Sequence, residues 1–189
     1  DFDAVDGPAV VAYEVKKYAC WHCVQGCGGI MSWDENGEAH EDHKPEYETM
    51  SAFGSLILNN DLDSIYYVND LLNRAGMDTI SAGSTVAFAM ECYEEGILNE
   101  EITGGLDLHF GNADAMLETL HQMGRGEGFG VTVGQGIRRM KEIFANEYGG
   151  DPGFLQDIGM EAKGLEYSEY VTKESLAQQG GYGLANKGT

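Results

Sequence analysis

Three of the four cysteines in this 189-residue chain lie within eight positions, as Cys20, Cys23 and Cys27. Their C-x2-C-x3-C spacing brings three thiolates to one point only if the backbone curls tightly. Gly26 and the two glycines after Cys27 can adopt the backbone angles that such a curl needs. Since thiolates ligate zinc and iron–sulfur clusters, the stretch predicts a metal or cluster site. A disulfide with one spare thiol, or three unrelated cysteines, is the alternative.

Zinc is a second candidate occupant of the cysteine stretch. Three cysteines with His22 or His40 would complete a tetrahedral zinc site. The chain would then be a zinc- or iron–sulfur-binding interaction module without catalysis of its own. Cys92 lies in a helical stretch rich in small residues, so we expect it to be a buried apolar side chain and not a ligand.

The composition excludes several classes of partner. The chain has 32 acidic and 11 basic residues, for a net charge of −21. Binding of nucleic acid or of an anionic membrane surface needs a basic face, so neither is expected. The sequence opens at Asp1 and has no signal peptide and no apolar run of membrane-spanning length. We therefore expect a soluble, cytoplasmic protein, processed or cut from a longer chain.

The apolar pattern predicts a mainly α-helical fold, with a cysteine-rich cluster loop and little strand near the N-terminus. Residues 10–15 are β-prone, and residues 30–45 are polar and predicted to be irregular. Helical periodicity begins after Pro45. An apolar stripe over residues 61–75 ends at Gly76, a residue type that commonly terminates helices.

Three further helices are predicted beyond Gly76. One begins at Asp78 or Thr79 and runs to about Glu95, and the next begins at Asn112. The last carries an apolar stripe from Val133 to Phe144. The glycines of residues 124–130 are interpreted as a joint between helices, because no Lys-Ser or Lys-Thr follows them as in a phosphate-binding loop.

Five stretches occur in an order that resembles the aldehyde ferredoxin oxidoreductase family of tungsten enzymes. They are the cysteine stretch, Pro45–Thr49 (PEYET), Asn69–Glu91, Leu106–Ala115 and Arg125–Gly130. The resemblance covers nearly all of residues 15–189. It implies that residues 1–189 are a single segment equivalent to the middle, helical domain of a three-domain enzyme. Residues 15–45 would be its cluster-binding loop, 46–150 its helical core, and 151–189 the start of the link to a third domain.

The resemblance also implies site residues. The family's [4Fe–4S] ligands fall on Cys20, Cys23 and Cys27, and its pterin motif D-x-x-G-L-D falls on residues 73–78. The cofactor-binding positions of that motif are Asn73, Gly76, Met77 and Asp78, with Asn73 in place of the family's aspartate and Met77 in place of its leucine.

The family's active-site glutamate falls on Glu48, and Tyr47 beside it is a second catalytic candidate. A carboxylate at such a position can take a proton from water or substrate. The resemblance therefore implies part of an anaerobic oxidoreductase that oxidises small aldehydes to carboxylic acids. Tungsten or molybdenum held by two pterins (molybdopterin) would take up the electrons, and the cluster would pass them to ferredoxin or another electron-transfer subunit.

The resemblance leaves two points open: a magnesium ion between the pterin phosphates and a homodimeric assembly. Because each cofactor site would be only partly supplied by these 189 residues, the segment alone is expected to be inactive.

Overall fold

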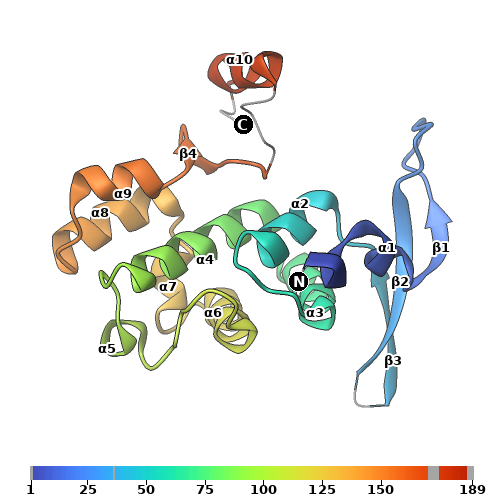
Figure 1. Ribbon diagram of the computed structural model, residues 1–189, viewed down its shortest axis with the longest axis horizontal. Helices are drawn as coiled ribbons and strands as arrows, with labels where there is room; N and C mark the ends of the chain where they lie inside the picture. Colours follow the sequence, from blue (N-terminus) through green and yellow to red (C-terminus); the bar gives the residue numbers. More distant parts are fainter. Residues whose placement is uncertain (1, 36, 170–174, 187–189) are drawn as a thin grey trace.

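The computed structural model describes residues 2–35, 37–169 and 175–186. It is mainly helical, as predicted, with a three-stranded sheet near the N-terminus (Figure 1). The helices are η1 (Phe2–Val5), α1 (Gly7–Val11), α2 (Tyr47–Met50), the π-helical turn η2 (Ser51–Ser55), α3 (Leu62–Ala75), α4 (Thr79–Glu94), α5 (Glu100–Thr103), α6 (Ala113–Arg125), α7 (Gly130–Val133), α8 (Ile137–Glu147), α9 (Pro152–Ile158) and α10 (Leu176–Leu184). The strands are β1 (Glu14–Tyr18), β2 (Gly28–Glu35), β3 (Glu38–His43), β4 (Glu161–Ala162) and β5 (Leu165–Glu166).

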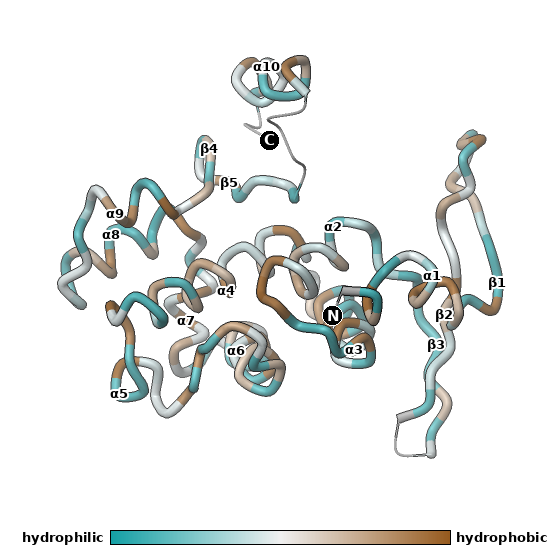
Figure 2. The backbone as a smooth tube through the Cα atoms, in the orientation of Figure 1, coloured by the Kyte–Doolittle hydropathy of each residue, from teal (hydrophilic) through white to brown (hydrophobic). Residues whose placement is uncertain are grey.

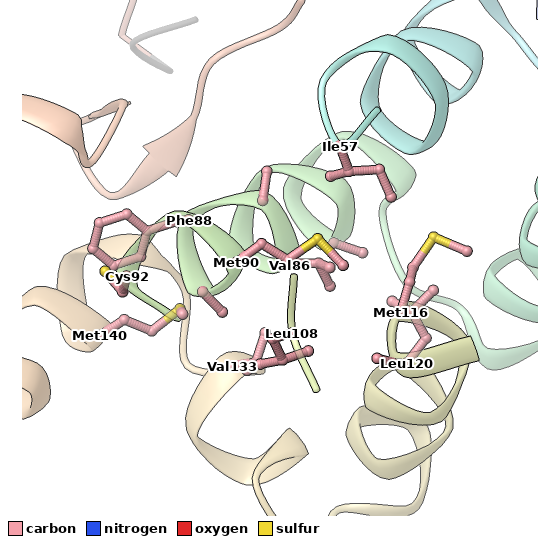
Figure 3. Packing of buried hydrophobic residues seen from close by; sticks show 14 of the residues in the cluster. Ile57, Val86, Phe88, Met90, Cys92, Leu108, Met116, Leu120, Val133 and Met140 are labelled. Atoms are coloured by element: carbon pink, nitrogen blue, oxygen red, sulfur yellow. The ribbon is translucent and has the colours of Figure 1, made fainter. Parts of the chain in front are cut away.

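Helix α4 is the centre of the helical body. Every residue from Ala82 to Met90 is buried, so the helix has no solvent-facing side over that length. Figure 3 shows Val86 and Met90 of α4 beside Leu108, Met116, Leu120 and Val133, and Phe88 and Cys92 beside Met140. A helix that is apolar all round must be covered on every side, and α2, α3, α6, α7 and α8 supply that cover.

Small side chains let α4 approach its neighbours closely. A Cβ atom placed on Gly83 would lie 2.5 Å from the Cβ of Ala52 in η2, so only glycine fits there. The fully buried Phe53 lies in the same turn. Close packing of this kind is tolerated only when neither partner carries a larger side chain.

The predicted helix boundaries are confirmed where a polar cap or glycine marks them. The side chains of Asp61, Asp78 and Asn112 each accept a hydrogen bond from a backbone N–H in the first turn of α3, α4 and α6. Helix α3 ends at Gly76, whose φ of 69° and ψ of 29° are left-handed, as the sequence predicted.

Two predictions about the N-terminal third are wrong. Val10 and Val11 belong to helix α1, which begins after a cap at Asp6 with Pro8 in its first turn; the strand begins only at Glu14. The segment predicted to be irregular forms the antiparallel strands β2 and β3. Met31 and Trp33 alternate inward from β2 and pack against Tyr66 of α3, whereas β1 and β3 are largely hydrophilic (Figure 2).

The last predicted helix is interrupted. Gly136, with φ of 84°, separates α7 from α8, although Val133, Ile137, Met140 and Phe144 are all buried as the stripe predicted. Beyond α8, the predicted linking segment contains α9, the β4–β5 hairpin and α10. Within this segment, positions 170–174 and 187–189 lie outside the described residues. The described helices are all too short or too polar to cross a membrane.

Gly130 provides a test of the packing between α6 and α7. A Cβ atom there would overlap the backbone of Gln122 and Met123, which cannot move aside as a flexible side chain can. We expect Gly130→Ala to lower the free energy of unfolding by about 1–3 kcal/mol, the usual cost of overpacking. Urea denaturation of the full chain measures this change.

Gly124→Ala is the matched control for that substitution. Gly124 lies on the exposed face of α6, with open space for a Cβ atom beyond the Met77 methyl at 3.8 Å. Since alanine favours a helix over glycine, this variant should be unchanged or more stable by up to about 1 kcal/mol. Equal stability of the two variants would contradict the packing account.

Candidate functional site

The three clustered cysteines lie in the connection between β1 and β2, and all three are exposed. The N–H of Cys23 donates to the carbonyl of Cys20 at 3.0 Å, which closes a turn, and Gly26 follows with a left-handed φ of 58°. The tight curl expected from the glycines is therefore present in part. Among the described residues, however, no three His, Cys, Asp or Glu side chains are arranged so that they could hold a metal ion.

The chemistry of the donors still fits a thiolate-ligated metal. Hydrogen bonds from the backbone N–H groups of Gln25 and Gly26 hold the pKa of the Cys23 thiol below its usual value. A lowered pKa favours the thiolate, which is the form that binds metal. Cys92 is the opposite case, because burial in α4 raises the pKa of its thiol to about 12. It packs as an apolar side chain, as predicted.

The two histidines of the zinc alternative have aromatic neighbours. The ring of His22 lies edge-on to Trp21 with centroids 4.0 Å apart, and His40 stacks on Trp33 within the sheet. His40 pairs with Trp33 across β2 and β3, outside the cysteine loop. Tyr18 lies at the end of β1, just before the cysteine loop, and its hydroxyl is 2.9 Å from Nδ1 of His43.

The base of this sheet is tied to the helical body. Nδ2 of the buried Asn69 in α3 donates to the carbonyl oxygen of His43 at 3.0 Å and to Oδ2 of Asp42 at 3.2 Å. On the sheet, Nζ of Lys44 lies 2.7 Å from a carboxylate oxygen of Glu14, whose side chain is 5% exposed. These contacts hold the β1–β2 hairpin that carries the cysteine loop at its tip (Figure 1).

Glu48 and Tyr47 occupy the first turn of α2, and both bond to one distant residue. Oε2 of Glu48 accepts a hydrogen bond from the backbone N–H of Glu169 at 2.7 Å. The hydroxyl of Tyr47 donates to the carbonyl oxygen of Glu169 at 3.2 Å. The backbone at Glu169 therefore fixes the position of both catalytic candidates.

The side chain of Glu169 adds a second carboxylate to this place. Its Oε1 accepts a hydrogen bond from the Ser84 hydroxyl of α4 at 3.2 Å. Burial raises the pKa of the Glu169 carboxyl. The hydrogen bond from Ser84 opposes that shift, and the nearby charge of Glu48 adds a smaller contribution that raises the pKa. No local pattern in the sequence marks Glu169, because it lies 121 residues from Glu48 and outside every recognised motif.

The structure brings the predicted pterin motif close to Glu48. The hydroxyl of the buried Thr49 donates to the hydroxyl of Thr79 at 2.9 Å, so α2 touches the first residue of α4. Asp78 immediately precedes it and caps α4 through a bond from the Ser81 N–H at 2.9 Å. Gly76 has open space above it, and Asn73 is exposed, whereas Met77 packs partly into the core.

The cysteine loop does not join this group. Figure 1 shows it at the free end of the hairpin, apart from α2 and the start of α4. The predicted site residues thus fall into two separate groups. Tyr47, Glu48 and the turn of residues 73–78 lie around the N-terminal end of α4, and the three cysteines lie at the tip of the β1–β2 hairpin.

The β4–β5 hairpin, which precedes Glu169, is held by buried charges. The carboxylate of Glu166, a residue only 5% exposed, accepts a hydrogen bond from the N–H of Ile137 at 2.8 Å and so caps α8 from outside the helix. Nζ of Lys141 lies 3.1 Å from Oε1 of Glu161, and both side chains are 10% exposed. Partly buried anions at a helix start are stabilised by its dipole, so this hairpin is fixed against α8.

A model of the aldehyde ferredoxin oxidoreductase family, covering its domains 2 and 3, matches residues 1–189. A tungsten-containing aldehyde ferredoxin oxidoreductase of Pyrococcus horikoshii is 35% identical over 90% of the chain and 25% of its own length. Its namesake in Pyrococcus furiosus is 33% identical over 96% of the chain and 28% of its own length. The chain thus spans about a quarter of the length of these curated relatives.

Two further proteins are similar. The WOR-like subunit of an aliphatic sulfonate oxidoreductase from Pyrococcus furiosus is 32% identical over 66% of the chain and 20% of its own length. The active site complex BamBC of benzoyl coenzyme A reductase, in complex with 1,5-dienoyl-CoA, superposes with a TM-score of 0.64. That structure is 21% identical and covers 82% of the chain and 22% of its own length, so it supports the fold alone.

The contrast between Cys23 and Cys92 predicts a pattern of thiol labelling. We expect iodoacetamide to modify Cys23 in the native chain down to a lower pH than in the urea-unfolded chain, because the two backbone N–H bonds favour its thiolate. Cys92 should be modified only after unfolding, since it is buried. Peptide mass spectrometry after timed alkylation across a pH series measures both rates.

Cys92→Ala serves as the control for total labelling. The native chain should lose no modification in this variant, whereas the unfolded chain should lose one modified site. Native labelling of Cys92 at the rate of the exposed thiols would show that α4 is not packed as described.

Proposed function

The chain belongs to the aldehyde ferredoxin oxidoreductase family, and from that premise we propose that it forms part of a tungsten-pterin oxidoreductase that converts aldehydes into carboxylic acids. The observation that carries the proposal is the convergence of Glu48 and the 73–78 turn at the start of α4, through the Thr49–Thr79 bond. The likeness of the chain to tungsten enzymes of Pyrococcus supports the reaction class.

Proton transfer is the part of this reaction that the chain's own residues can perform. An aldehyde and one water give a carboxylic acid, two protons and two electrons, so a base near the reacting carbon is required. Glu48 is that base in our proposal, because a positioned carboxylate can take a proton from water or from the hydrated substrate. One of its oxygens accepts the Glu169 N–H, and among the described residues no hydrogen bond is made to the other oxygen, whose lone pairs can accept a proton.

The donor groups fit the cofactors that the family implies. Cys20, Cys23 and Cys27 would supply thiolates to an iron–sulfur cluster, and Asn73, Gly76, Met77 and Asp78 would lie against one pterin of a tungsten or molybdenum centre. When bound, these groups would supply the redox chemistry, taking up the two electrons and releasing them singly. In this proposal ferredoxin or another electron-transfer subunit accepts them.

The amide of Asn73 changes the hydrogen bonds that the turn of residues 73–78 could make to a pterin. A carboxylamide both donates and accepts hydrogen bonds, whereas the aspartate that the family pattern has there only accepts them. The open space above Gly76 leaves room for a flat ring system at this exposed turn. The chain would therefore recognise a pterin edge by hydrogen bonding without adding a negative charge beside its phosphate.

We expect Cys20→Ser, Cys23→Ser and Cys27→Ser each to remove most of the iron and acid-labile sulfide from the full-length enzyme. Serine is a poor substitute for a thiolate ligand, and the loop offers no replacement. Iron and sulfide analysis of the purified enzyme measures the loss. Cys92→Ala is the control and should retain the full content, so a comparable loss in that variant would disprove the assignment.

We expect Glu48→Gln to lower turnover by about 10²–10⁴-fold, the usual contribution of a general acid–base group. The amide oxygen of glutamine can still accept the Glu169 N–H, so the fold and the tungsten and pterin contents should not change. Steady-state aldehyde oxidation with a dye as acceptor, alongside metal analysis, measures both.

Glu46→Gln is the matched control for Glu48. Glu46 is exposed two residues earlier and makes no capping bond to α2, so the same loss of charge there should leave turnover within about twofold. Wild-type turnover of Glu48→Gln, or an equal loss in both variants, would refute the role of Glu48 as the base.

A further inference from the structure

A cavity of about 700 Å³ lies between α4, α10 and the segment that follows β5. Its apolar floor includes Ala87 and Phe88 of α4 with Ile137 of α8, and Phe88 stacks on Phe144 of the core. Tyr167 and Tyr182 form part of the opposite wall, with their rings 5.5 Å apart. A volume of this size accommodates an organic molecule with several carbon atoms beyond a carbonyl group.

The cavity and the proposed catalytic carboxylate share a neighbour, Glu169. Glu169 lines it, and the backbone N–H of the same residue bonds Glu48 at 2.7 Å. The Ser84 hydroxyl also lines the cavity and bonds Glu169. Tyr47 and Glu48 do not line the cavity themselves, so a molecule seated on the apolar floor would lie next to the residue that holds them.

The charges of the cavity are of one sign. Among its described lining residues, the charged side chains are Glu91 and Glu169, and no lysine or arginine is included. Burial raises the pKa of both carboxyl groups. An anionic ligand would meet negative charge or a desolvated carboxyl group and would find no described cation to pair with.

We propose that this cavity binds the uncharged, apolar part of the substrate and that Glu91 and Glu169 reject anionic compounds of the same shape. The word substrate rests on the proposed function, whereas the binding preference rests on the cavity itself. The preference selects neutral aromatic or aliphatic carbonyl compounds over carboxylates, sulfonates and phosphorylated thioesters. Two of the similar proteins are named for an aliphatic sulfonate and for benzoyl coenzyme A. In this proposal the cavity of the present chain disfavours both of these anionic classes of compound.

Binding of three naphthalene probes to the full chain without cofactors tests the proposal. The probes are 2-naphthamide, which is uncharged, and the anions 2-naphthoate and naphthalene-2-sulfonate, which share its ring. Isothermal titration should give at least tenfold tighter binding for the amide, which corresponds to about 1.4 kcal/mol. Equal or tighter binding of either anion would overturn the proposal.

Three variants locate the binding. Ala87→Phe should fill the floor and weaken naphthamide binding at least tenfold, with circular dichroism used to check that the helices remain. Glu91→Gln should reduce the discrimination against 2-naphthoate severalfold, whereas Glu101→Gln, exposed on α5 and outside the lining, should not change it. Unchanged binding in a folded Ala87→Phe chain, or equal effects of the two glutamine variants, would contradict the assignment.

These measurements separate the inference from the proposed function. Binding is read without turnover, so a full-length enzyme that fails to oxidise aldehydes would refute the function and leave the cavity preference standing. An active aldehyde oxidase whose cavity binds the anions better would refute the preference alone.

Discussion

The burial of α4 from Ala82 to Met90 is the constraint on which the rest of the structure depends. A helix without a polar face has to be surrounded, so α2, α3, α6, α7 and α8 take their places around it. The candidate site follows from this arrangement. Glu48 lies on a helix that covers α4, Asp78 caps its first turn, and Ser84 is one of its own buried residues. The packing that stabilises the domain therefore also assembles the polar groups at one end of it.

Buried charges hold the β4–β5 hairpin against α8. Glu166 caps α8 from a neighbouring hairpin, and Glu161 pairs with Lys141 of α8. Isolated buried charges are costly, but each of these has a hydrogen-bonding partner. Together they fix the backbone that leads to Glu169, and the backbone of Glu169 in turn holds Tyr47 and Glu48. The position of the proposed base is thus determined by ionic contacts that are remote from it.

Local signals in the sequence were sufficient for some features and not for others. The caps at Asp61, Asp78 and Asn112 and the terminator Gly76 act within one helical turn, so the ends of these helices were predictable. Strands β2 and β3 were missed because their side chains alternate weakly and only Met31 and Trp33 face the core. The sheet is specified by pairing between strands, which local periodicity does not report.

The site was predictable only in its separate motifs. The cysteine spacing and the 73–78 turn were visible in the sequence, and the left-handed Gly76 confirms the predicted helix end. The cluster prediction stays a prediction, because the described side chains are not arranged to hold a metal ion. Glu169 could not be found, because its hydrogen bond to Glu48 forms only after α4 has been covered on both sides.

The N-terminal sheet and the Glu48–Glu169 bond also differ in the length of chain that must be closed to form them. The sheet joins strands that are neighbours in sequence and closes short loops, whereas the Glu48–Glu169 bond closes a loop of 121 residues. The cysteine hairpin can therefore form early during synthesis, before the chain that completes the Glu48–Glu169 contact has been made.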